Sequence, residues 1–360
     1  MRLPAVLCLA LVAACTSSGG TTTSPRSASP SSAQPSHLGS PSPSPATSPA
    51  PSAAPDRIVV AAARAAGTLE LFTLASGAQA AVPLRTLEGP AHHVVASVSL
   101  SAGISPTVCA VWRPAASDTQ GSFELRCYPP GASAGRGIRS DVNVEIGLRA
   151  DGRAIAWTEG NQELVIADLA AGVATVRSRM RYNPAAPEGG YPESLDELDW
   201  IGPRTLVGTA SGDSDESVGL CVIDLDHPRP RQDQVGFGHC LRPAGAEARA
   251  GYAHFEEAAL VAPGEAVVVE RAQGCCMENP GVPAGRAVRL RLSDGAVLGV
   301  FATARPGRDV VDVSGGSRAV LYTTAADGED RVVSLRWAGQ PHGSPVTGLP
   351  RDTLLAVVQP

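Results

Sequence analysis

The sequence predicts an all-β fold, a ring of six four-stranded antiparallel sheets that forms a six-bladed β-propeller. Three observations lead to this prediction. One stretch of about 40 residues has the pattern of four short strands with a turn at each junction. The same pattern recurs along the chain, and the chain ends on a single apolar strand that has no strand after it to pair with.

The clearest blade lies at residues 141–177. Apolar and polar residues alternate from Val142 to Ile146, which is typical of a half-buried strand. Asp151-Gly152 is a two-residue hairpin signal, and the apolar run Ala154–Thr158 follows it. A further strand pattern at Leu164–Leu169 precedes another turn, so this stretch predicts one complete blade.

The blade pattern recurs with steps of 47 to 61 residues between successive second strands. We expect these second strands to begin near Arg57, Thr107, Ala154, Thr205, Ala266 and Ala319. The third strands are expected at Thr68–Leu74, Phe123–Tyr128, Leu164–Leu169, Val218–Leu225, Ala287–Leu292 and Val332–Trp337.

The first blade has no innermost strand of its own, because the segment before Arg57 is rich in Ser and Pro. The lone apolar strand Thr353–Val358 can supply it. We therefore expect this strand to pair into the first blade and close the ring, which removes the exposed edges of an open stack.

Two segments carry a family resemblance. Leu148–Trp157 followed by Leu164–Leu169 resembles the repeat of TolB-like, WD40-like propellers, in which an Asp-Gly turn precedes a strand and a later strand ends in Asp-Leu. Cys221–Leu225 and Ala262–Ala266 are similar to parts of it. The resemblance implies a propeller over residues 57–360, and we expect no counterpart of the extra α/β domain that TolB carries.

The first 14 residues predict an export signal, since one Arg precedes an apolar run, Leu3–Ala14, that is too short to span a bilayer. The run ends in Val12-Ala13-Ala14-Cys15, which resembles the lipobox of bacterial lipoproteins and implies that Cys15 carries lipid. An ordinary cleaved signal with an accidental Cys is the alternative. With at least two acyl chains, such as palmitate, Cys15 would anchor the protein stably on the extracytoplasmic face of the cell membrane.

Residues 15–55 predict a disordered tether, because Thr16–Pro55 contains 13 Ser, 9 Pro and 5 Thr among 40 residues. An extended Pro-rich chain of this length reaches on the order of 100 Å. The tether is either a stalk across a cell wall, with or without glycans, or a passive spacer.

Residues 56–360 predict the propeller domain, and the composition of the chain excludes several classes of function. The net charge of −6, without a basic stripe, argues against a nucleic-acid partner. All 29 basic residues are Arg. The absence of Lys excludes phosphate-loop NTPases, pyridoxal Schiff bases and Ser-x-x-Lys acyl enzymes, and we expect no cofactor.

Six Cys remain once Cys8 leaves with the signal and Cys15 carries lipid, and they allow 15 pairings in principle. The blade pattern favours Cys109 with Cys127, which lie on the second and third strands of blade two, and Cys221 with Cys240, which flank the outer strand of blade four. Each bridge would stabilise the fold by roughly 3 kcal/mol. Cys275-Cys276 either form a vicinal disulfide or belong to a metal or redox site.

Long loops of consecutive blades emerge on one face of the predicted ring, where binding usually occurs. They are Ser178–Ser194, Ser211–Ser217, Gly238–Ala253 and Gln273–Gly285. Eight carboxylates lie between Glu188 and Glu216. We expect a binding surface there, formed by Tyr182, Tyr191, Glu193, Asp196, Glu197, Asp213, Asp215 and Glu216. The loop at residues 213–216 either contacts calcium or a cationic ligand or is a solvated acidic rim.

No catalytic motif stands out, so we expect a binding or scaffold module at the cell envelope, with a protein or glycan partner. The alternatives are an enzyme acting on an envelope glycan or peptide, and a sensor of ions or small ligands. An enzyme would need carboxylates or His from several blades facing the central channel. The innermost strands offer acidic residues, but we do not expect them in equivalent positions: Glu145, Asp199, Glu256, Glu257 and Asp312. Trp112, Trp157 and Trp337 are expected to pack between blades.

Overall fold

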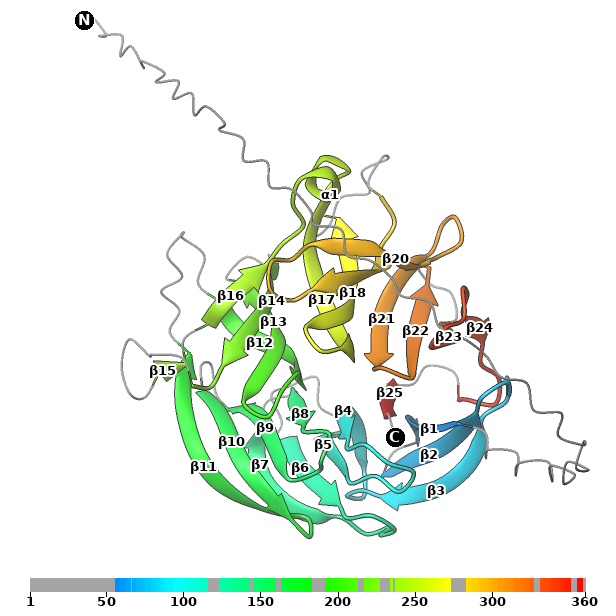
Figure 1. The fold of residues 1–360 in the computed structure, drawn as a ribbon. Helices are drawn as coiled ribbons and strands as arrows, with labels where there is room; N and C mark the ends of the chain where they lie inside the picture. Colours follow the sequence, from blue (N-terminus) through cyan, green and yellow to red (C-terminus); the bar gives the residue numbers. More distant parts are fainter. Residues whose placement is uncertain are drawn as a thin grey trace, which may run out of the picture. The chain divides into compact units, whose positions relative to one another are not determined.

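The structure, a computed structural model, confirms a six-bladed propeller of four-stranded antiparallel blades. It describes residues 56–65, 67–115, 123–142, 145–159, 163–182, 192–212, 217–226, 234–235, 237–272, 283–326, 331–350 and 355–358. Figure 1 shows the sheets arranged around a common axis. In this part of the chain, no helix has the length and apolar character that crossing a membrane requires.

Each blade contains four antiparallel strands that follow one another from the axis outward. Blade one contains β25 (Leu355–Val358), β1 (Arg57–Ala65), β2 (Thr68–Ala75) and β3 (Val82–Glu88). Blade two contains β4 (His93–Leu100), β5 (Val108–Pro114), β6 (Phe123–Tyr128) and β7 (Arg136–Val142). Blade three contains β8 (Ile146–Leu148), β9 (Ala154–Glu159), β10 (Glu163–Ala170) and β11 (Val173–Tyr182).

The remaining three blades follow the same plan. Blade four contains β12 (Pro192–Trp200), β13 (Thr205–Gly212), β14 (Ser217–Asp224) and β16 (Phe237–Leu241). Blade five contains β17 (Tyr252–Ala262), β18 (Glu265–Ala272), β19 (Arg286–Arg291) and β20 (Val297–Thr303), and the short helix α1 (Ala246–Arg249) precedes it. Blade six contains β21 (Asp309–Gly315), β22 (Ala319–Ala325), β23 (Val332–Trp337) and β24 (Ser344–Pro345).

The end of the chain closes the ring, as the sequence predicts. Strand β25 pairs antiparallel with β1, from Val59 opposite Val358 to Ala62 opposite Leu355. Blade one is therefore built from both ends of the propeller domain (Figure 1). One further strand links neighbouring blades: β15 (Gln234–Val235), which lies between β14 and β16 in the chain, pairs parallel with β11 of blade three.

The predicted boundaries of blade three need one correction. Val142 does not belong to the innermost strand of that blade, because it ends β7 and pairs with Phe123 of blade two. The innermost strand is β8, at Ile146–Leu148. The apolar alternation from Val142 to Ile146 continues across the connection between two blades, so periodicity alone could not locate the break.

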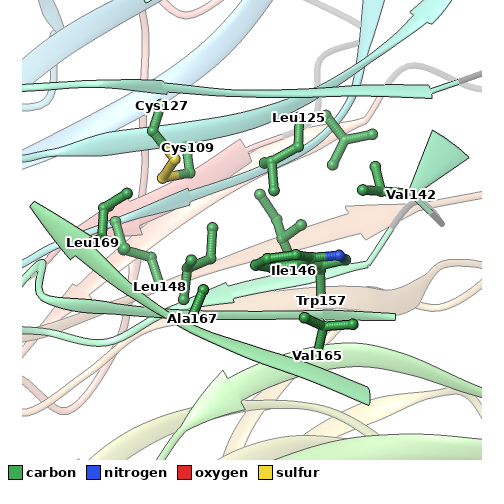
Figure 2. Close-up of a cluster of buried hydrophobic side chains, with 12 residues drawn as sticks. Cys109, Leu125, Cys127, Val142, Ile146, Leu148, Trp157, Val165, Ala167 and Leu169 are labelled. Carbon is green, nitrogen blue, oxygen red and sulfur yellow. A yellow bond between two sulfur atoms is a disulfide. The ribbon is translucent and has the colours of Figure 1, made fainter. Parts of the chain in front are cut away.

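The core consists of six apolar clusters, one at each contact between neighbouring blades. Successive side chains of a strand point to opposite faces, so a strand supplies both neighbours. In β9, Ile155 and Trp157 pack towards blade two, whereas Ala154 and Ala156 pack towards blade four. Figure 2 shows the cluster between blades two and three, where Trp157 lies beside Val165 and Ile146.

The predicted interblade packing of Trp side chains is confirmed. Trp112 lies between blades one and two, Trp157 between two and three, and Trp337 between six and one. All three are buried, and Trp200 fills the same role between blades three and four.

Two disulfides are formed as predicted. Cys109–Cys127 joins β5 to β6 with a Cα–Cα distance of 4.1 Å, and Cys221–Cys240 joins β14 to β16 with 3.9 Å. Each bridge therefore staples two hydrogen-bonded strands of one blade. Figure 2 shows the first bridge at the edge of the cluster between blades two and three. Cys275 and Cys276 lie outside the described residues.

Ring closure predicts a strong dependence of stability on the last strand. Removal of residues 355–360 leaves the inner edge of β1 without its four register pairs. At about 1 kcal/mol for each lost backbone hydrogen bond, we expect the melting temperature to fall by about 10 °C. Thermal unfolding followed by circular dichroism measures this change. Removal of residues 359–360 alone is the control, and an equal loss in both variants would contradict closure by β25.

Candidate functional site

The innermost strands form a cavity of about 620 Å³ at one end of the central channel. Its wall is made where these strands finish, by residues of β4, β8, β12, β17 and β21 and of the turns that follow them. Five blades therefore contribute to one cavity. Ligand sites in proteins are usually concave and largely formed before the ligand binds.

The wall of this cavity is acidic. It holds five carboxyl groups from four blades and, within the described part of the chain, no Arg or His. The carboxyl groups belong to Glu145, Glu197, Asp199, Glu257 and Asp312. This set lies on blades three to six, whereas blade two contributes Ser97 and Ser99.

Irregularities in the innermost strands bring these groups to the axis. The pairing of β12 with β13 shifts register between Asp196 and Asp199, and that of β17 with β18 shifts between Glu256 and Ala258. Glu197 and Glu257 lie at these bulges with φ of 54° and 44°, a region that residues other than Gly rarely adopt. A bulge interrupts the strict alternation of side chains and re-aims one of them, here towards the channel.

Three Glu side chains connect neighbouring blades through backbone hydrogen bonds. The backbone N–H of Glu197 donates to Oε2 of Glu145 over 3.0 Å, and that of Glu257 donates to Oε2 of Glu197 over 2.8 Å. The N–H of Val313 donates to Oε2 of Glu257 over 2.9 Å. The hydroxyl of Thr209 also donates to Oε2 of Glu197. Each carboxyl group thus fastens its own innermost strand to that of the next blade.

This arrangement corrects the expectation that the acidic residues of the innermost strands are not equivalent. Equivalent roles in blades three, four and five belong to Glu145, Glu197 and Glu257. Glu256 is different, because it bonds to His254 and forms an ion pair with Arg271 instead of lining the cavity.

Burial changes the charge of the cavity. It raises the pKa of Glu197 to about 7, and it raises the pKa of Asp199 to about 7 although the backbone N–H of Trp200 donates to that side chain. Burial, reinforced by the negative charges of Asp312 and Glu197, raises the pKa of Glu257 well above its usual value, and burial also raises that of Asp312. Protons therefore partly neutralise the cavity near pH 7.

A cation in the cavity would favour the ionised carboxylates and displace these protons. Within the described residues, no group of three or more acidic, His or Cys side chains has the arrangement of a metal site. The chemistry that the wall offers is the acceptance of hydrogen bonds from a positively charged group.

The structure places the residues of the predicted binding surface at different ends of the strands. Glu197 lines the cavity. Glu193 and Asp196 lie before Glu197 in β12, and Tyr182 is the last residue of β11. Tyr191, Asp213, Asp215 and Glu216 lie outside the described residues, as does Cys15.

The cavity lies at the opposite end of the innermost strands from the strand ends that the predicted loops join. The expected loops join β11 to β12, β13 to β14, β16 to β17 and β18 to β19, and these strand ends lie where innermost strands begin. The loop Gly238–Ala253 is shorter than predicted, since Gly238 lies in β16 and the connection contains α1. The surface over those loops remains a prediction, and the cavity is a second candidate.

The raised pKa values predict that stability depends on pH. Folding favours the neutral forms of Glu197 and Asp199, so their contribution is fully present below about pH 4 and is lost as the pH rises through about 7. Glu197→Gln and Asp199→Asn should each stabilise the protein at pH 8.5 by about 1–3 kcal/mol, or about 2–6 °C, and by much less at pH 4.

Thermal melts at both pH values measure this effect. Asp226→Asn is the matched control, because Asp226 is exposed and pairs with the exposed Arg204. Destabilisation of the two cavity variants at pH 8.5, or an equal response in the control, would contradict the assignment.

Comparison with known proteins agrees with the fold. No family model and no curated protein matches the sequence. Among solved structures, TolB from Acinetobacter baumannii has a TM-score of 0.51 at 12% identity, over 84% of this chain and 67% of TolB. A putative 6-phosphogluconolactonase from Bacteroides uniformis has a TM-score of 0.43 at 12% identity, over 81% and 82% of the two chains. The propeller domain of Cps50 (Swd1) from Myceliophteria thermophila has 0.44 at 13%, over 83% and 82%. The resemblance to TolB that the repeat predicts is thus confirmed for the fold.

Proposed function

We propose that this chain is a lipid-anchored, extracytoplasmic binding module that recognises a positively charged group of an envelope partner in its acidic cavity. The observation that carries the proposal is the convergence of five carboxyl groups from four blades on one cavity. The lipobox-like segment that ends at Cys15 and the Ser- and Pro-rich stretch after it support the location. The two disulfides agree with an oxidising compartment.

The scaffold suits recognition because it holds the cavity rigidly. Each innermost strand packs between two neighbours, and the carboxyl groups of Glu145, Glu197 and Glu257 fix the spacing of four blades. A cavity that is formed before binding loses little conformational entropy when a ligand enters.

The raised pKa values also favour a second candidate function. Carboxyl groups that titrate near pH 7 and face one cavity are suited to general acid and base chemistry. An enzyme acting on an envelope glycan or peptide would use them in this way. The two candidates differ in one outcome, since a binding module returns its captured partner intact and an enzyme returns it cleaved.

Lipid anchoring predicts the behaviour of a Cys15→Ala variant. Without the acyl chains, the protein should move from the membrane fraction to the soluble fraction, which ultracentrifugation and immunoblotting measure. Cys8→Ala is the matched control, because Cys8 lies within the predicted export signal. Continued membrane binding of the Cys15 variant would contradict the anchor.

Recognition at the cavity predicts a position-specific crosslink in intact cells. A photoreactive residue, p-benzoylphenylalanine, replaces Ala150 at the cavity rim, Tyr182 near the predicted loop surface, or Val176 on the outer strand of blade three. We expect a partner to be captured from position 150 and not from position 176. The product should weaken severalfold when Asp199→Asn is added, since one acceptor of positive charge is lost.

Other results of the crosslinking experiment have defined meanings. Capture from position 182 alone would assign recognition to the opposite end of the strands and overturn the cavity proposal. Equal capture from all three positions would indicate a non-specific product. Mass spectrometry of the captured partner shows whether it is intact or cleaved.

A further inference from the structure

A second hollow extends the acidic cavity outward between blades five and six. It has a volume of about 510 Å³ and is lined by β18, β19 and β20 on one side and by β22 and β23 on the other. Val261, Gly316 and Ser317 line both hollows. The two are therefore neighbours, and a ligand of sufficient length can occupy both. We call the second hollow the radial groove.

The radial groove has the opposite charge to the cavity. Its wall contains Arg289, Arg318 and Arg336 and, among the described residues, no carboxyl group. Arg336 is held in place by neutral partners: its guanidinium lies 4.3 Å from the ring of Phe301 and donates to the carbonyl oxygens of Phe301 and Gln340. These contacts fix the position of the charge without neutralising it.

The other two Arg lie beside carboxylates instead of neutral groups. Arg289 forms an ion pair with Glu265, and Arg318 lies 3.4 Å from Asp56. Both Arg side chains are about half exposed, and exposed ion pairs of this kind contribute little to stability, so either Arg can exchange one carboxylate for another. Arg336 is thus the fixed cationic contact of the groove.

The wall of the groove also offers apolar contacts. Leu298 and Val300 of β20 line it with 40% and 51% of their surfaces exposed, and Phe301 follows them. Exposed apolar side chains next to fixed charges are typical of surfaces that bind a partner.

We propose that the cavity and the radial groove together bind one extended peptide segment of the partner protein, with a positively charged group in the cavity and an acidic side chain over Arg336. This inference rests on the proposed function of the cavity and adds the order of the charged groups along the bound segment of the partner. An extended peptide is long and narrow, and its side chains can present a basic group, apolar groups and an acidic group in sequence. Charge complementarity along both hollows selects this ligand over one with a single charge.

Selection from random decapeptides displayed on phage tests the inference. The bait is the full chain in detergent micelles, either wild type, Arg336→Gln or Asp199→Asn combined with Glu257→Gln. With the wild type, we expect enrichment of a basic residue and of an acidic residue at a fixed spacing. The Arg336→Gln bait should lose only the acidic preference, and the cavity variant should lose only the basic one.

Affinities of one selected peptide measured by fluorescence anisotropy make the test quantitative. We expect Arg336→Gln to weaken binding about tenfold, since it removes a charge-assisted contact. Arg177→Gln is the matched control, because Arg177 is exposed on β11 of blade three, and it should change affinity less than twofold. Arg318→Gln is a second groove variant and should weaken binding severalfold. This variant still tests the radial groove if the Arg336 variant does not fold.

The outcomes separate the two proposals. A basic preference without an acidic one leaves the cavity proposal intact and overturns the role of the radial groove. The absence of any basic preference overturns both. Equal loss of affinity in Arg177→Gln and Arg336→Gln would also overturn the groove, because it would show that only the net charge matters.

Discussion

The fold depends on one constraint: each sheet is apolar on both of its faces. In β9 the alternate residues Ile155 and Trp157 are as buried as Ala154 and Ala156, so neither face can be left in water. A stack of such sheets would always leave two outer faces exposed. Only a closed ring gives every face a neighbour, and the contact of blade six with blade one, through Leu321 and its cluster, completes it.

The same constraint determines what can reach the axis. Because both faces of a sheet are used for packing between blades, the channel is lined by the edges and bulges of the innermost strands. Glu197 and Glu257 occupy such bulges, and their carboxyl groups bond to backbone N–H groups of the next blade. The same side chains therefore connect the blades and line the cavity, and burial raises the pKa of both carboxyl groups.

The architecture could be predicted from the sequence because it depends on local signals. Strand alternation, Asp-Gly turns and a lone terminal strand are readable over a few residues, and so is the proximity of Cys109 to Cys127 on adjacent strands. The break between β7 and β8 could not be located, since the apolar pattern continues across it.

The cavity was harder to predict because it depends on contacts between residues about 50 to 60 positions apart. The sequence could assign acidic residues to the innermost strands, but no turn residue marks the bulges that carry Glu197 and Glu257. A useful signal was present: the acidic pairs Asp196-Glu197 and Glu256-Glu257 stand in the middle of the strands β12 and β17, next to apolar residues. Such pairs in an innermost strand point to a bulge that turns one carboxyl group towards the channel.

The position of the two disulfides affects the order in which the domain assembles. Both bridges join strands of a single blade that are close in the sequence, so blades two and four can be locked before later segments of the chain have folded. Blade one behaves in the opposite way, because its innermost strand is near the last residue of the chain. Until that strand has paired, Val59 and its neighbours in β1 present an open edge, so this interval is when the domain is most exposed to edge-to-edge association with another chain.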